Sequence, residues 1–184
     1  MLIQGHGSPQ PDVIIVSDIP HGDDIRSGYA ITGYQESVIR EFCNHASLNI
    51  NNFYRTCLIK EEIPKTSDKN TIHLEIPRYG PLLLDEIKTL NPFLLVPLGE
   101  LSFNYLTSLN SIRKFRGSVV LAEGSHGLPR PYKVMPILGP YPYLNQEYRL
   151  KYISQLDFQK ISKHLNLEPP PDKSTKCWIA YKSL

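Results

Sequence analysis

The sequence has few cysteines, no long apolar run and almost no net charge. Its three cysteines, Cys43, Cys57 and Cys177, are widely spaced and form no Cys-x-x-Cys pair, a pattern that fits neither a disulfide framework nor a zinc or iron–sulfur site. No apolar stretch approaches the roughly 20 residues of a membrane span, and the amino terminus has no signal-peptide profile. We therefore expect a cytoplasmic protein with no metal, no cofactor and no membrane partner.

The overall charge of the chain does not indicate whether its partner is a polyanion. The 20 Lys and Arg residues nearly cancel the 18 Asp and Glu residues, so the net charge of +2 argues neither for nor against a polyanionic partner. Only local clusters of charge could mark a phosphate-binding surface. A glycine-rich phosphate loop of the Walker or dinucleotide type is also lacking after Val16, which disfavours an unrelated small-ligand binder of the α/β class.

The stretch from Asp12 to Gly33 is the most informative part of the chain. Four apolar β-branched residues, Val13 to Val16, predict a fully buried strand, and the loop that follows carries Asp18 and His21. In an open α/β sheet, ligands bind just beyond the carboxyl ends of such strands. Two further carboxylates, Asp23 and Asp24, either position a water or a metal ion or, as we favour, belong to a solvated turn.

Strand-like and helix-like segments alternate along the rest of the chain. This alternation predicts an α/β fold, a three-layer α/β/α sandwich with a short, mainly parallel central sheet. Pro136 is awkward inside a central strand and predicts an edge position or a bend. We expect strands at 13–16, 53–59, 92–99, 119–122 and 132–138, a surface loop at 60–70, and helices from 32–34 to 46, from 80–81 to 90, at 100–109 and at 146–165.

The carboxyl-terminal segment departs from this alternation. We expect one domain over residues 1–165, followed at 166–184 by a proline-rich hinge, Pro169 to Pro171, and a strand-like tail, Cys177 to Tyr181. The tail either belongs to a larger polypeptide or folds back onto the domain.

Two further segments are candidates for contact with DNA. Arg113, Lys114 and Arg116 surround Phe115, and such a cluster either tracks a nucleic-acid strand or is a solvated loop with its aromatic ring anchored in the core. The rigid segment that begins Gly139-Pro140-Tyr141 either wedges into a groove or is a stiff connection.

The order of these motifs resembles the uracil-DNA glycosylase superfamily, especially the glycosylase-like domains at the amino terminus of some bacteriophage DNA polymerases. The resemblance covers about residues 5–165 and implies a bacteriophage origin, hence the cytoplasm of a bacterial host. The motifs that carry it are Ser17-Asp18-Ile19-Pro20-His21, Asp23-Asp24, Gly28 to Gly33, Thr56-Cys57, Asn91 to Gly99, Arg116-Gly117, Gly139-Pro140 and Asp157.

The resemblance assigns a role to several residues. Asp18 takes the place of the family's carboxylate, or it caps the following turn or the helix behind it. His21 could help it as a hydrogen-bond donor, or it is a partly exposed side chain with no special task. The aromatic residue that stacks on a flipped base falls on Ile31, with Tyr29 or Tyr34 as substitutes if the loop is rearranged. The uracil-reading Asn falls on Cys57, and the His that stabilises the leaving base falls on Gly139. Most of the family's base-reading chemistry is therefore replaced.

Three functions remain open at this point. The first is a DNA-binding domain of glycosylase fold with lost or weak uracil excision, accessory to phage DNA replication or repair. The second is an active DNA glycosylase that hydrolyses the N-glycosidic bond with Asp18, and the third is an unrelated α/β binder of a small ligand. For the first two we expect DNA as partner, single-stranded or as a distorted duplex, and a DNA polymerase in cis or in trans.

Overall fold

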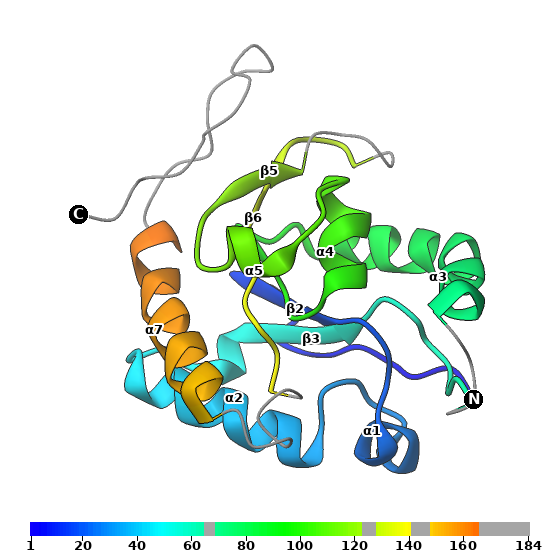
Figure 1. Ribbon diagram of the computed structural model, residues 1–184, viewed down its shortest axis with the longest axis horizontal. Helices are drawn as coiled ribbons and strands as arrows, with labels where there is room; N and C mark the ends of the chain where they lie inside the picture. Colours follow the sequence, from blue (N-terminus) through cyan, green and yellow to red (C-terminus); the bar gives the residue numbers. More distant parts are fainter. Residues whose placement is uncertain (65–68, 123–127, 141–147, 166–184) are drawn as a thin grey trace.

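A six-stranded sheet forms the centre of the protein. The structure is a computed structural model and describes residues 1–64, 69–122, 128–140 and 148–165 (Figure 1). The strands lie in the order β1-β3-β2-β4-β6-β5. Their bounds are His6–Gly7 for β1, Val13–Ser17 for β2, Phe53–Cys57 for β3, Leu94–Pro97 for β4, Val120–Ala122 for β5 and Tyr132–Val134 for β6.

The sheet is mainly parallel, as predicted. β2 pairs in parallel with β3 on one side and with β4 on the other, and β4 pairs in parallel with β6. The short edge strands β1 and β5 are antiparallel to their neighbours. The carboxyl ends of β2, β3, β4 and β6 therefore meet at one edge of the sheet.

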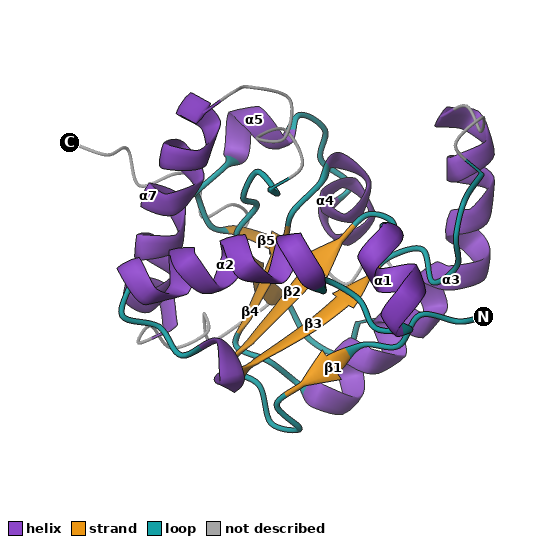
Figure 2. Cartoon of the chain, turned by 90° about the horizontal axis from the view of Figure 1, so that it is seen from below, coloured by secondary structure: helices purple, strands orange, loops and turns teal. Residues whose placement is uncertain are grey.

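Helices cover both faces of the sheet, which confirms the three-layer α/β/α prediction (Figures 1 and 2). α2 and α7 pack on one face, where the Phe42 and Phe158 rings lie 5.3 Å apart, and α3 and α4 pack on the other. The helices are α1 Gly22–Ser27, α2 Gly33–His45, α3 Lys69–Leu90, α4 Glu100–Thr107, α5 Ile112–Phe115 and α7 Tyr148–Leu165, with a 3-10 helix at Ile50–Asn52.

The unbroken apolar run in β2 follows from its central position. Val13 and Ile15 enter the core beneath α2 and α7, whereas Ile14 and Val16 enter the core beneath α3 and α4. All four side chains are fully buried. Because each strand residue points to the opposite face from its neighbour, a strand covered on both faces needs no polar position.

Pro136 does not mark an edge strand, because β6 lies between β4 and β5 and ends before the proline. The backbone N–H groups of Met135 and Ile137 donate to the carbonyls of Leu95 and Pro97 in β4. Alternate residues of an extended chain turn their N–H groups to opposite sides. The nitrogen of Pro136 thus faces away from β4, and the missing donor breaks no bond to that strand.

The helix expected from residue 80 or 81 is longer than predicted, because α3 already begins at Lys69. The expected loop at 60–70 therefore ends inside a helix. Pro77 and Pro81 both lie within α3 on its exposed side. The carbonyls that lose a partner to these prolines are four residues earlier, on the side where water can bind them.

The segment after β2, expected to be a loop, contains the short helix α1. Asp24 in this helix is 1% exposed, so its assignment to a solvated turn is wrong. Its carboxylate accepts hydrogen bonds from the backbone N–H of His21 at 2.9 Å and from the N–H and hydroxyl of Thr32 at 2.7 and 2.9 Å. Asp24 thereby holds both ends of the segment together.

Asp23, the neighbouring carboxylate, faces the start of α2. It pairs with Arg26 and accepts a hydrogen bond from the backbone N–H of Tyr34. Gly33 is needed beside it, because its φ is +57° and a Cβ atom there would collide with the Asp23 carboxylate.

Several predictions concern residues outside the described ones. The hinge at 169–171 and the strand-like tail at 177–181 lie there, as do Gln146 and Glu147 at the expected start of the last helix. The proposed domain boundary at residue 165 stays a prediction. Within the described ranges, no helix is both long enough and apolar enough to cross a membrane.

Replacing Asp24 by alanine should lower the free energy of unfolding by about 2–4 kcal/mol, because three donors lose a buried charged acceptor. Urea denaturation followed by circular dichroism measures this change. Asp85→Ala is the matched control, since that side chain is 71% exposed on α3, and it should change stability by less than about 0.5 kcal/mol. Equal effects of the two substitutions would contradict a structural role for Asp24.

Candidate functional site

A cleft lies at the edge of the sheet where the parallel strands end. Its volume is about 310 Å³. Residues that follow β2, β4 and β6 form most of its wall, and the first turn of α2 closes it. The lining residues are Ser17, Asp18, Ile19, His21, Gln35, Leu98, Gly99, Leu101, Gly139 and Pro140. The structure thus brings together four of the predicted site residues, namely Asp18, His21, Gly139 and Pro140.

Asp18 caps the amino terminus of α4. Its carboxylate accepts hydrogen bonds from the backbone N–H groups of Leu101 at 3.1 Å and Ser102 at 2.8 Å, and from the Ser102 hydroxyl at 2.6 Å. The first amides of a helix have no partner within the helix, so an acidic side chain there is stabilising. The contact also needs Gly99, because a Cβ atom at that position would collide with the carboxylate.

This cap limits what Asp18 can do chemically. Burial raises the pKa of its carboxyl, and the hydrogen bonds from Ser102 and Leu101 oppose that shift. A carboxylate has about four acceptor positions, and the cap uses three of them. Little capacity is left to orient a water or to stabilise positive charge on a sugar.

His21 lies at the start of α1 and lines the cleft. Burial lowers the pKa of its imidazole to about 4. The ring is therefore neutral at pH 7 and carries one N–H, which can donate a hydrogen bond but adds no positive charge.

Two of the predicted base-binding residues are buried in the core and do not line the cleft. Cys57 at the end of β3 is fully buried, and burial raises the pKa of its thiol to about 12. Ile31 is also fully buried, in a backbone conformation with φ of 55°. In contrast, Tyr29 is 49% exposed and packs against His6, with 5.4 Å between the ring centroids.

Gly139 lies on the cleft wall close to the backbone of Leu98. Its N–H donates to the Leu98 carbonyl at 2.9 Å, and a Cβ atom on Gly139 would come within 2.8 Å of the same oxygen. The histidine that the family places here would therefore need a shift of the backbone. Pro140 follows on the wall, and Tyr141 lies outside the described residues.

The predicted basic cluster forms the short helix α5 and the residue after it, and it divides into two parts. The Arg116 guanidinium pairs at 2.7 Å with Asp157 of α7, whose side chain is 1% exposed, so this ion pair connects two elements of the fold. Phe115 is partly buried against Phe103, with 5.8 Å between the ring centroids. Arg113 and Lys114 are exposed and remain available to a partner.

α5 is fixed at the rim of the cleft by Glu100. The carboxylate of Glu100 accepts hydrogen bonds from the backbone N–H groups of Ser111 and Ile112, at the start of α5. The neighbours of Glu100 in sequence, Gly99 and Leu101, both line the cleft. The first turn of α4 thus joins the cleft to the helix that carries the exposed cations.

Gln35 belongs to this site although the sequence did not mark it. It is the third residue of α2, is 5% exposed and lines the cleft. The available signal was weak, because a polar residue near the start of an amphipathic helix is common. Its place in the cleft depends on how α2 packs against the sheet, which periodicity does not reveal.

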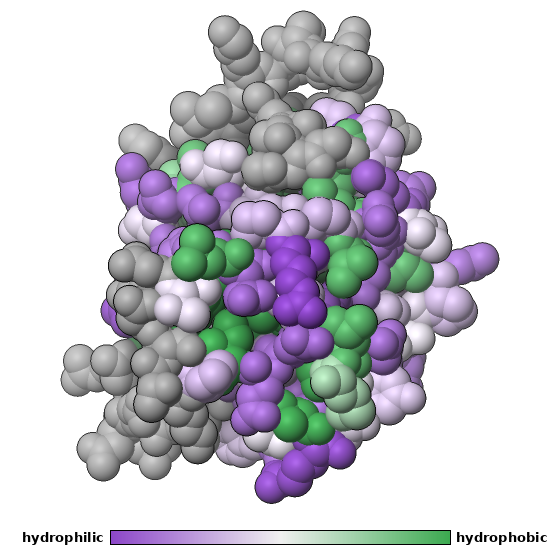
Figure 3. All heavy atoms as spheres, turned by 90° about the vertical axis from the view of Figure 1, so that its right-hand side faces the viewer, coloured by the Kyte–Doolittle hydropathy of each residue, from purple (hydrophilic) through white to green (hydrophobic). Residues whose placement is uncertain are grey.

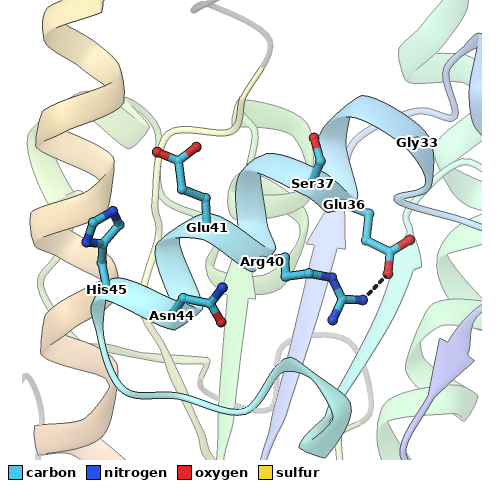
Figure 4. Close-up of a pocket in the computed structure, with 7 residues that line it drawn as sticks. All are labelled: Gly33, Glu36, Ser37, Arg40, Glu41, Asn44 and His45. Carbon is cyan, nitrogen blue, oxygen red and sulfur yellow. Dashed lines mark hydrogen bonds and ion pairs between the residues drawn. The ribbon is translucent and has the colours of Figure 1, made fainter.

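Other hollows lie on the helices. A groove of about 540 Å³ is lined only by α2 residues, shown in Figure 4, with Glu36 and Arg40 joined at 2.7 Å. On the face with the amino terminus and α3, apolar residues lie among hydrophilic ones (Figure 3). None of the predicted catalytic, base-binding or DNA-binding residues lines the α2 groove, whereas four of them line the cleft at the strand ends, which is therefore the stronger candidate.

Comparison with known proteins gives a distant relative. No protein-family model matches the chain. A DNA polymerase of Bacillus phage SP01 is 25% identical to it over 157 residues, which is 84% of this chain and 16% of the polymerase. The chain therefore corresponds to a small part of that polymerase. The similarity agrees with the predicted link to phage DNA polymerases, and the glycosylase part of the resemblance stays a prediction.

We expect stability to fall as the pH drops from 6.5 to 4, in part because of His21. The unfolded chain binds a proton on this residue near pH 6.5, whereas the folded protein does so only near pH 4, so the unfolded state binds more protons in between. His21→Gln removes this contribution, and urea denaturation at pH 7, 5.5 and 4.5 should show a weaker loss for the variant. His45→Gln, at an exposed position, should leave the profile unchanged. Parallel profiles for His21→Gln and the unmodified protein would contradict this role.

Proposed function

We propose that this chain is a DNA-binding domain of uracil-DNA glycosylase-like fold, with lost or weak uracil excision, that serves phage DNA replication or repair. The observation that carries the proposal is the engagement of Asp18, the family's carboxylate position, in the cap of α4. The order of the motifs and the similarity to a phage DNA polymerase support the assignment.

The chemistry of base excision explains why we expect this site to excise uracil weakly or not at all. Cleavage of a glycosidic bond needs an extrahelical base, an activated water or carboxylate near the sugar, and a donor for the charge on the leaving base. Asp18 is occupied by the helix cap, and the positions of the family's two base-contacting side chains hold a buried thiol, Cys57, and a glycine, Gly139. A site without these hydrogen bonds loses both rate and selectivity.

DNA binding is supported by the arrangement of α5 at the rim of the cleft. Arg113 and Lys114 are exposed there, and cations at such a position neutralise phosphates along a strand. The partner we propose is single-stranded DNA or a distorted duplex, because both present bases that can leave the stack at low cost.

A DNA polymerase is the proposed second partner. The chain is similar to about 16% of the length of the phage polymerase, and this similarity supports an association with a polymerase. The domain acts either within one polypeptide with a polymerase or as a separate chain that joins it.

An active DNA glycosylase is the second candidate, and one observation favours it. Asp18 and His21 line the same cleft, so a carboxylate and a neutral imidazole donor face a single small space. These are the two groups that the reaction would use, and the excision assay described below separates this candidate from the first.

Single-stranded oligonucleotides should bind at low salt, with an affinity that falls steeply as salt rises. Arg113→Ala and Lys114→Ala should each weaken binding several-fold and reduce the slope of log K against log salt by about 0.7 per lost phosphate contact. Fluorescence anisotropy at 25–200 mM salt, roughly the range where such slopes are resolved, measures both values. Lys88→Ala is the control, since Lys88 lies near the end of α3, before the amino end of β4, and it should have no effect. Absence of binding at the lowest salt would overturn the proposal and favour a small-ligand binder.

Uracil should not be released from uracil-containing oligonucleotides, whether single- or double-stranded. The assay is alkaline cleavage of end-labelled substrate after incubation with protein in excess. The comparison variant is Asp18→Asn, checked by circular dichroism because the substitution also weakens the α4 cap. Robust cleavage that Asp18→Asn abolishes in a folded protein would establish the second candidate instead.

A further inference from the structure

Gln35 carries a feature that the proposed excision chemistry does not use. Its side-chain nitrogen is buried and has no hydrogen-bond partner, while the residue as a whole is 5% exposed. The same side chain lines the cleft beside Asp18, His21 and Gly139.

An unsatisfied buried amide is unfavourable, so its position needs a reason. Buried polar groups in proteins are almost always hydrogen-bonded, and a buried donor without a partner costs free energy. The nearby carboxylates accept hydrogen bonds from other groups, since Asp24 binds Thr32 and the backbone N–H of His21, and Asp18 binds three donors of α4. A ligand in the cleft is the partner that Gln35 lacks.

The rest of the wall limits what this ligand can be. Ile19, Leu98, Leu101 and Pro140 give the cleft an apolar lining around a few polar groups, which suits a flat ring with polar edges. The volume of about 310 Å³ is at the lower end of the range for small-molecule sites, so the cleft suits a ligand about the size of one base. Because the unpaired atom is a donor, the ring must present an acceptor.

We propose that Gln35 is the specificity-determining residue of the cleft and that its amide binds the carbonyl edge of an extrahelical pyrimidine. A glutamine amide offers two donors and an acceptor in one plane, so it can bind a carbonyl oxygen and the adjacent ring nitrogen together. This inference rests on the proposed function, since it requires that the cleft receives a base from DNA. Gln35 would then supply the base reading that Cys57 and Gly139 do not.

Anisotropy titration with fluorescein-labelled single-stranded oligonucleotides tests the role. Three oligonucleotides are compared, and all their flanking bases are adenine. They differ only at the central position, which is thymine, adenine or an abasic tetrahydrofuran residue. The unmodified protein should bind the thymine oligonucleotide about 5-fold more tightly than the other two, the effect of one net hydrogen bond. Gln35→Leu should still bind all three, with that preference lost, and should melt at a higher temperature because it removes the unpaired amide.

Gln159→Leu, on the exposed side of α7, is the matched control and should keep the preference. Binding of all three oligonucleotides by the unmodified protein with no preference for thymine would overturn the role of Gln35 while leaving DNA binding intact. An equal preference in Gln35→Leu would overturn it as well.

Failure of every oligonucleotide to bind would instead overturn the proposed function, and with it the reading of a base from DNA by Gln35. Recognition of the pyrimidine edge by the Gln35 amide is then tested by thymidine alone, added to ¹⁵N-labelled protein. The side-chain amide signal that disappears in Gln35→Leu should shift on addition of thymidine, and an unchanged signal would overturn the inference.

Discussion

The cap that Asp18 places on α4 is the interaction on which the cleft depends. It joins the end of β2 to a helix more than 80 residues later in the chain, and it requires a glycine at position 99. The first turn of α4 in turn fixes α5 through Glu100. The cleft wall and the exposed cations of α5 therefore share one anchor, a carboxylate in the position where the resemblance places a catalytic group.

Other charged residues that the sequence analysis named as site candidates also make structural contacts. Asp24 closes the segment around α1, and Arg116 pairs with the buried Asp157 of α7. Asp18, Asp24 and Arg116, which the sequence analysis considered for catalysis, a solvated turn and DNA contact, are thus all bound to other parts of the fold. Gln35, which suggested nothing, retains an unpaired donor at the cleft. This distribution of satisfied and unsatisfied groups supports recognition of a base more than its removal.

The sequence predicted the layers well because their signal is local. The apolar run of β2 and the helical spacing of Val38, Ile39 and Phe42 in α2 each reflect burial on a known period. Prediction from the sequence failed where tertiary contacts decide the local structure. α1 begins at the glycine of a Pro-His-Gly sequence that is typical of a turn, and it is held by the contacts of Asp24 with Thr32.

The predicted start of α3 was too late for a related reason, since Pro77 and Pro81 are tolerable inside the helix because they lie on its exposed side. For the site, the sequence marked the loop beyond the carboxyl end of β2, and Asp18 and His21 of that loop do line one cleft, together with Gly139 and Pro140. The burial of Cys57 and Ile31 was not predictable, because a strand end or a short loop gives no sign of how much of each side chain the core covers.

The most direct test of DNA recognition at this edge of the sheet is a backbone ¹H–¹⁵N chemical-shift map with a short single-stranded oligonucleotide. The largest shifts should fall on residues 17–21, 98–101 and 139, at the cleft, and on 112–115 of α5. Shifts confined to the opposite edge of the sheet, around residues 53 and 94 where β3 and β4 begin, would contradict DNA recognition in the cleft.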